Sequence, residues 1–154
     1  MLQLSALIAG ERPVLYISAE ESARQLRLRA ERLKIQRKEQ IEVVSATEID
    51  FLGSLAIEKY GMIVVDSLQT IKMSSVPSLP GCVVLVRVCA NMLFSLAKSS
   101  DIPVLIVSHI TKGGQIAGPK LVEHVVDTVL YFESSKTGFR FLRTIKNRFG
   151  PSDE

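Results

Sequence analysis

Glu20, Asp66 and His109 each stand at the end of a short apolar run, or just beyond it, and they are the polar residues best placed to do chemistry. Short apolar runs rich in β-branched residues predict strands that are buried on both faces of a parallel sheet. The carboxyl ends of such strands meet at one edge of the sheet, where ligands bind. The positions of Glu20, Asp66 and His109 therefore predict one shared site.

These residue types fit the chemistry of phosphate transfer. An aspartate at the end of a buried strand can hold the water shell of Mg²⁺, and an acid such as Glu20 or Glu21 can orient or deprotonate an attacking water. Each residue also has a structural explanation, since Asp66 can cap a helix and both glutamates can stabilise a helix N-terminus. The convergence of polar strand ends favours an active site, whereas His124, on an apolar helix face, is expected to be structural.

Composition limits the classes of protein that remain. The 154 residues are 47% hydrophobic and 23% charged, which predicts a single globular domain and excludes a mainly disordered chain. The apolar runs are shorter than the roughly 18–20 residues that a membrane span needs, and no basic segment precedes the first of them. We therefore expect a cytoplasmic protein without a membrane partner. The net charge of +3 gives mild support to a polyanionic partner.

The sequence offers no disulfide, no zinc-site motif and no phosphate loop. Cys82 and Cys89 are seven positions apart in an expected helix, about 10 Å along its axis, so a disulfide between them is implausible. No Cys/His cluster has the spacing of a zinc site, and we expect this chain to bind no zinc. No G-x-x-x-x-G-K-[ST] phosphate loop occurs either, because the glycine-rich segment that ends at Lys120 has another spacing and no Ser or Thr after the lysine.

The hydrophobic pattern predicts an α/β fold. Helices are expected over 1–9, 20–33, 48–59 and 83–98, and Ser18 can cap the second of them. Strands are expected over 14–18, 41–45, 62–66 and 104–109, followed by a β-hairpin made of 128–134 and 139–149. The segment 69–81 is rich in Pro and Ser, and the segment 111–120 has three glycines and one proline, so both are expected to be long loops with a function or with mobility.

Four segments of the sequence resemble the RecA-like ATPase core of the bacterial RadA/Sms family. They are ISAEESARQLRLRAERL (17–33), IVVDSLQTI (63–71), VSHITKGGQIAGPKLVEHVVDTVLYFE (107–133) and KNRFG (146–150), of which KNRFG is the most specific. The resemblance implies one partial RecA-like P-loop NTPase domain over 1–154, with a mostly parallel sheet, flanking helices and a C-terminal β-hairpin. The first strand and the phosphate loop of that fold would be missing. In function it implies a DNA-dependent ATPase and ring helicase that drives branch migration in homologous recombination and DNA repair, using ATP and Mg²⁺.

The resemblance also assigns roles to residues around the predicted site. Glu20, rather than Glu21, resembles the catalytic glutamate that polarises water. Asp66 resembles the Walker B aspartate, which acts on Mg²⁺ through water, and Ser67 beside it is expected to contribute to nucleotide binding. His109 stands where related proteins keep a polar sensor of the γ-phosphate.

Basic residues are assigned to the nucleotide and to DNA in the same way. Lys146 and Arg148 of KNRFG resemble a pair of basic fingers that reach the γ-phosphate of a neighbouring subunit, where positive charge stabilises phosphoryl transfer. Lys72, Lys112 and Lys120 would face DNA in the channel of the ring. The implied partners are single-stranded or branched DNA and further copies of the chain in a ring, expected to be a hexamer, with a recombinase filament as a further candidate.

Two alternatives to this interpretation remain open at the level of sequence. The first is a non-catalytic DNA-binding or ring-assembly protein that keeps the basic residues without a nucleotide pocket. The second is a KaiC-like or DnaB-like relative, against which KNRFG argues.

In the RadA family a zinc module, the first strand and the phosphate loop precede the position of Met1, and a Lon-protease-like domain follows that of Glu154. Because the first strand is central in such sheets, we expect the 154 residues alone to be poorly stable or aggregation-prone and to bind ATP weakly or not at all.

Overall fold

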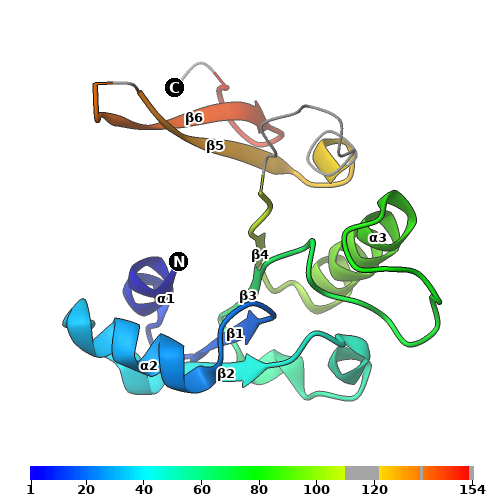
Figure 1. Cartoon of the computed structure of the whole chain (residues 1–154), viewed down its shortest axis with the longest axis horizontal. Coiled ribbons are helices and arrows are strands. Elements are labelled where there is room, and N and C mark those ends of the chain that lie inside the picture. The colour runs from blue at the N-terminus through cyan, green and yellow to red at the C-terminus, as the bar shows by residue number, and fades with distance from the viewer. Residues whose placement is uncertain (110–121, 136, 153–154) are drawn as a thin grey trace.

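The computed structural model describes residues 1–109, 122–135 and 137–152. Its main sheet has four parallel strands in the order β2-β1-β3-β4 (Figure 1). These strands are β1 (Val14–Ser18), β2 (Ile41–Ser45), β3 (Met62–Asp66) and β4 (Val104–Ile106). The first three have the bounds that the apolar runs predicted, because β-branched residues fit a sheet that is covered on both faces.

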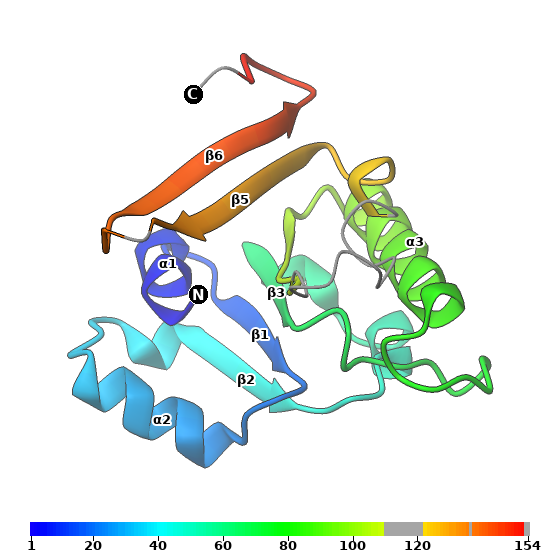
Figure 2. The same ribbon diagram turned by 45° about the horizontal axis from the view of Figure 1, so that its top comes forward.

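Helices cover both faces of this sheet (Figures 1 and 2). Side chains alternate along a strand, so neighbouring residues enter different cores. Tyr16 packs in a cluster with residues of α1 (Leu2–Ile8) and α2 (Ala23–Arg32), whereas Ile17 packs in a cluster with residues of α3 (Val83–Ser100). The predicted α/β class and the flanking helices are confirmed.

The C-terminal hairpin forms a sheet of its own, in which β5 (Thr128–Ser134) pairs antiparallel with β6 (Arg140–Asn147). It lies apart from the four-stranded sheet in the views of Figures 1 and 2. Among the described strands, β4 pairs only with β3 and β5 pairs only with β6. The expected hairpin is confirmed, and the low stability expected from open strand edges stays a prediction.

The predicted helix over 48–59 is wrong. Two short 3₁₀-helices occupy this region, η2 (Asp50–Gly53) and η3 (Ile57–Lys59), and a third, η1 (Lys38–Gln40), precedes β2. Gly53 and Ser54 are poor helix formers in the middle of the segment. Leu52 and Ile57, on either side of them, are both buried in the cluster beneath α3, and the break between the two turns allows both to reach it.

Two further predictions about local structure are corrected. The cap of α2 is Ser22, whose hydroxyl accepts from Gln25 N while the Gln25 side chain accepts from Ser22 N, so a capping box begins the helix. Ser18 accepts instead from Glu21 N at 3.1 Å and stabilises the turn after β1. The strand expected over 104–109 ends at Ile106, because Ser108 and His109 leave the sheet to bond with a side chain described below.

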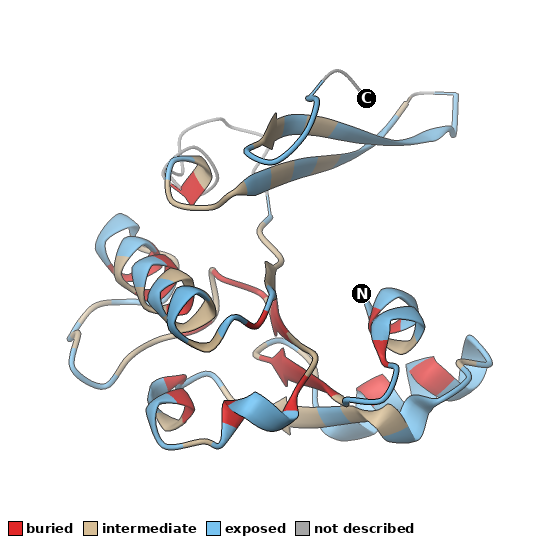
Figure 3. Cartoon of the chain, turned by 180° about the vertical axis from the view of Figure 1, so that it is seen from behind, coloured by how far each residue is buried: buried red, intermediate tan, exposed pale blue. Residues whose placement is uncertain are grey.

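By length and composition, α3 is long and apolar enough to cross a membrane. The lengths of the continuous apolar runs in the sequence did not predict this. Core helices of globular proteins pass the same test. In this chain Leu85, Cys89 and Leu93 form a buried side of α3 that packs on the sheet, and Arg87 and Asn91 are exposed on its other side (Figure 3). Five of its 18 residues are buried, so packing in the core accounts for part of its apolar character, while Val83 and Val84 at its N-terminal end are exposed.

Candidate functional site

The register of the sheet brings the predicted residues to one edge. Ser18 of β1 is the partner of Asp66 of β3, and Ala19 N donates to Asp66 O at 2.8 Å just beyond the strands. Glu20 and Ser67 therefore emerge at the same level from neighbouring strands. The chain leaves β4 on the other side of β3, so His109 reaches the same edge.

Glu20 is the centre of a small polar cluster. Its Oε1 accepts a hydrogen bond from the Ser67 hydroxyl and lies 3.5 Å from His109 Nε2. The Ser67 side chain is fully buried, while those of Glu20 and His109 are 40% and 59% exposed. The structure thus places Glu20 in contact with both Ser67 and His109, and its carboxylate is held by these two side chains while remaining partly open to solvent.

Asp66 is held by a different partner. Its Oδ2 accepts from the Tyr16 hydroxyl at 2.5 Å, across the two neighbouring strands β1 and β3. Burial raises the pKa of Tyr16 well above its usual range, and the hydrogen bond to Asp66 raises it further. Tyr16 therefore remains a proton donor at neutral pH and orients the Asp66 carboxylate.

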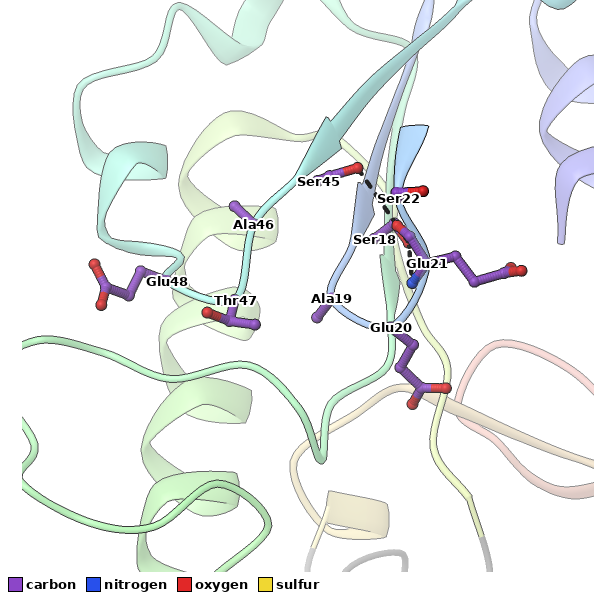
Figure 4. Close-up of a pocket in the computed structure, with 9 residues that line it drawn as sticks. All are labelled: Ser18, Ala19, Glu20, Glu21, Ser22, Ser45, Ala46, Thr47 and Glu48. Carbon is purple, nitrogen blue, oxygen red and sulfur yellow. Dashed lines mark hydrogen bonds between the residues drawn. The ribbon is translucent and has the colours of Figure 1, made fainter. Parts of the chain in front are cut away.

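The two neighbouring glutamates have different surroundings. In Figure 4 the side chains of Glu20 and Glu21 leave the turn after β1 in different directions. Glu21 forms an ion pair with Arg29 of α2, with 2.6 Å between Arg29 Nη1 and Glu21 Oε2. Only Glu20 contacts Ser67 and His109, which favours Glu20 for the role that sequence analysis assigned to it.

The turn after β1 lines an open pocket made of Ser18, Ala19, Glu20, Glu21, Ser22, Ser45, Ala46, Thr47 and Glu48.

Gln69 holds the segment that carries His109. Its Nε2 donates to Ser108 Oγ at 2.7 Å and to His109 O at 3.2 Å, and His109 N donates back to Gln69 Oε1 at 3.3 Å. The amide thus binds the backbone of His109 on both sides and fixes the direction in which the chain leaves β4. This clamp adds a connection between the end of β3 and the end of β4.

The chain is similar in sequence to known proteins over its whole length. No protein-family model matches the chain. It is 48% identical to a "DNA repair protein RadA" of Bacillus subtilis and 45% identical to one of Listeria monocytogenes, in both cases over 100% of the chain and 34% of the relative. The chain carries a RadA-like RecA core. It spans about a third of the length of these curated relatives.

A solved structure shows the same fold. The structure titled "Crystal structure of the RadB recombinase" matches 99% of this chain and 76% of its own with a TM-score of 0.66. The sequence identity is 18%, so this likeness concerns the fold alone. The RadA-like core thus has the architecture of a RecA-like recombinase core, as the sequence predicted.

The predicted fingers of the RadA-like core are engaged within their own chain. Lys146 Nζ donates to the carbonyl oxygens of Glu123 and Val126 at 2.8 and 2.7 Å, and Arg148 Nη1 lies 2.6 Å from Asp127 Oδ1. Among the described residues, no hydrogen bond or ion pair joins Lys146 or Arg148 to Glu20, Asp66 or His109. Their assigned role toward a neighbouring subunit stays a prediction.

The three lysines assigned to DNA have different outcomes. Lys72 lies after β3, and its Nζ is 3.0 Å from Glu48 Oε1, so its charge is paired in this structure. Lys112 and Lys120 lie outside the described residues. The assignment of these lysines to DNA also stays a prediction.

The residues at the edge of the sheet fit magnesium bound together with a nucleotide. Mg²⁺ prefers oxygen ligands and is commonly held by one or two carboxylates, several waters and the phosphates of the substrate. Asp66, oriented by Tyr16, provides one such carboxylate, whereas the Ser67 hydroxyl beside it is buried and bonded to Glu20. The described residues contain no group of three or more His, Cys, Asp or Glu that could hold a metal, so the fit is to a metal that binds with phosphates and water.

Sequence analysis missed Tyr16 and Gln69. A signal for Tyr16 was present, because a tyrosine inside an aliphatic buried strand needs a hydrogen-bond partner for its hydroxyl. For Gln69 there was none, since its partners Ser108 and His109 are 39 and 40 positions away along the chain. Only the pairing of β3 with β4 brings them together.

Proposed function

We propose that this chain is the hydrolytic part of an ATP-driven motor in DNA repair and recombination. The observation that carries the proposal is the contact of Glu20 with Ser67 and His109, beside an Asp66 that Tyr16 holds in place. A carboxylate fixed at the carboxyl edge of a parallel sheet, next to a second carboxylate suited to magnesium, is the arrangement that nucleotide hydrolysis needs. The RadA proteins of similar sequence are named for DNA repair, which supports the same assignment.

In this proposal each residue has a defined task. Glu20 orients the attacking water and accepts its proton at a carboxylate oxygen, while Ser67 and His109 keep that carboxylate in position. Asp66 holds the water shell of the metal, with Tyr16 fixing its orientation. When bound, Mg²⁺ neutralises charge on the phosphates of ATP.

Lys146 and Arg148 act across a subunit boundary in this proposal. Fixed positive charge near the γ-phosphate stabilises the transition state of phosphoryl transfer. In the ring, Arg148 would exchange Asp127 for the phosphate of the neighbouring subunit, because both are anions that a guanidinium binds well. The proposal is completed by a cytoplasmic ring in which each subunit contributes one RecA-like domain. The ring acts on single-stranded or branched DNA, and Lys72, Lys112 and Lys120 face that DNA.

The phosphate loop is the part that this chain does not supply. None of the 154 residues form a G-x-x-x-x-G-K-[ST] segment, so hydrolysis requires such a segment from sequence outside them. This observation also favours the second candidate, a non-catalytic DNA-binding or ring-assembly protein. The two candidates differ in one measurement, since only the first predicts hydrolysis once a phosphate loop directly precedes Leu2.

The test compares ATP hydrolysis, with DNA present, by the 154 residues alone and by a longer protein in which a phosphate loop directly precedes Leu2. Only the longer protein should hydrolyse ATP. In it, Asp66→Ala and Arg148→Ala should abolish hydrolysis, and Arg148→Ala should still bind nucleotide. Arg143→Ala is the matched control, because Arg143 pairs with Glu133 at 3.2 Å on the same hairpin and should leave the rate unchanged.

Each outcome separates the possibilities. Normal hydrolysis by Arg148→Ala in the presence of DNA would show that Arg148 is not a finger. If the longer protein binds DNA but never hydrolyses ATP, the non-catalytic candidate is correct and the proposed ATPase is wrong.

A further inference from the structure

The segment 24–38 holds an unusual share of the charge of the chain. It contains seven basic residues and one acidic residue, Glu31, which gives it a net charge of +6. The whole chain has a net charge of only +3, so all other residues together carry −3. The seven residues are called here the basic α2 surface: Arg24, Arg27, Arg29, Arg32, Lys34, Arg37 and Lys38.

All seven side chains are exposed, while α2 is held by its other side. Leu26 and Ala30 are buried against the sheet, and the outer side of α2 is exposed to solvent in Figure 3. Arg24 and Arg32 are eight positions apart, which places them on one side of the helix about 12 Å from each other. The basic α2 surface therefore presents its charges away from the core.

Internal partners neutralise only part of this charge. Arg27 pairs with Glu31 at 3.2 Å, and Arg29 pairs with Glu21 at 2.6 Å. Among the described residues, no carboxylate pairs with Arg24, Arg32, Lys34, Arg37 or Lys38.

The helix dipole accounts for Arg29 and Arg32, which stand in the last turn of α2, but it does not account for Arg24. Arg24 stands in the first turn of α2, which has no acidic residue, although the helix dipole favours negative charge there.

We propose that the basic α2 surface binds the phosphate backbone of a second DNA segment, separate from the DNA assigned to Lys72. This inference rests on the proposed function, because it requires a protein that works on branched or paired DNA. Five of the seven residues are arginines, whose planar guanidinium binds phosphate through two parallel hydrogen bonds. A helix that lies in a membrane surface needs a continuous exposed apolar side. In α2 the buried Leu26 and Ala30 leave only Leu28 as a large exposed apolar residue within the helix, so an anionic lipid surface fits less well.

The position of α2 makes the second segment distinct from the first. α2 covers the sheet face that is occupied by Tyr16 and Val64. Ile71, next to Lys72, packs on the opposite face in the cluster with α3. DNA on the basic α2 surface would therefore lie on the other side of the sheet from DNA at Lys72.

The test measures binding of a labelled DNA duplex by fluorescence anisotropy over a range of NaCl concentrations. The variant Arg24→Gln/Arg32→Gln/Lys34→Gln removes three charges of the surface. Its matched control is Arg87→Gln/Lys98→Gln/Arg140→Gln, which removes two arginines and one lysine that are exposed elsewhere. Each lost phosphate contact lowers the slope of log K against log salt by about 0.9, so the surface variant should lose about 2–3 units of slope and bind at least about tenfold more weakly. The control should bind as the wild type does.

A second measurement does not depend on the folding of a variant. Bound duplex should protect Lys34 and Lys38 of the wild-type protein from acetylation and leave Lys98 reactive. Equal affinity and slope for the two variants, or equal reactivity of Lys34 and Lys98, would overturn the inference while DNA binding itself persists. Loss of binding only to phosphatidylserine vesicles would assign the surface to lipid instead. If the wild-type chain binds no DNA at all, the proposed function and this inference both fail.

Discussion

The hydrogen bond from Tyr16 to Asp66 can be measured with one substitution. Tyr16→Phe removes the hydroxyl and keeps the ring in its packing, but it leaves Asp66 Oδ2 without its donor. Tyr16 is only 1% exposed, so water cannot readily replace the lost partner. Hydrogen bonds to charged groups contribute about 1.5–3 kcal/mol. We expect the free energy of unfolding to fall by about 2 kcal/mol.

Tyr60→Phe is the matched control. Tyr60 is 2% exposed and donates to the carboxylate of Glu42 at 2.6 Å, so the chemistry of the substitution is the same. The Glu42 side chain is 46% exposed and also pairs with Lys59, so water and the ammonium can replace the lost hydroxyl. We expect a loss of about 0.5–1 kcal/mol for this variant.

The assay is urea unfolding followed by far-ultraviolet circular dichroism, since the chain has no tryptophan. With a slope of about 2 kcal/mol per molar urea, the midpoint of Tyr16→Phe should fall by about 1 M and that of Tyr60→Phe by less than about 0.5 M. Equal midpoints at two protein concentrations would show that aggregation does not contribute. Equal shifts for the two variants, or no shift for Tyr16→Phe, would refute the reasoning.

Three further expectations follow from the structure. Burial and the hydrogen bond to Asp66 raise the pKa of Tyr16, so the unfolded chain loses this proton at a lower pH than the folded chain. The contribution of Tyr16 to stability is therefore full below about pH 10 and falls above it. The free energy of unfolding should fall more steeply with pH in the wild type than in Tyr16→Phe, and parallel curves would contradict this. In the protein extended by a phosphate loop, Gln69→Leu should slow ATP hydrolysis about tenfold or more at unchanged nucleotide affinity, because the backbone of His109 loses its hydrogen bonds to the amide. A wild-type rate would show that this clamp is dispensable. Among the described strands, β4 and β5 each have one edge without a partner, which predicts that the 154 residues alone melt below about 50 °C. A cooperative transition at higher temperature together with micromolar ATP binding would exclude this.

Local pattern predicted most of the fold because the strands are buried on both faces. Continuous apolar β-branched runs gave β1, β2 and β3 with their observed bounds, and the alternating C-terminal segments gave the hairpin. The prediction failed for the segment 48–59, where packing against the core, and not the local sequence pattern, decides the local structure. Leu52 and Ile57 each reach the core beneath α3 from a short 3₁₀ turn, so the helix expected over 48–59 does not form.

The sequence by itself determined that Glu20, Asp66 and His109 share one edge, because parallel strands necessarily place their carboxyl ends together. Which contacts these residues make was decided only by the tertiary structure. The pairing of β1 with β3 sets Tyr16 against Asp66, and the pairing of β3 with β4 sets Gln69 against His109. These partners are 50 and 40 positions apart, and hydrogen bonds depend on distance and direction in space, which spacing along the chain does not give.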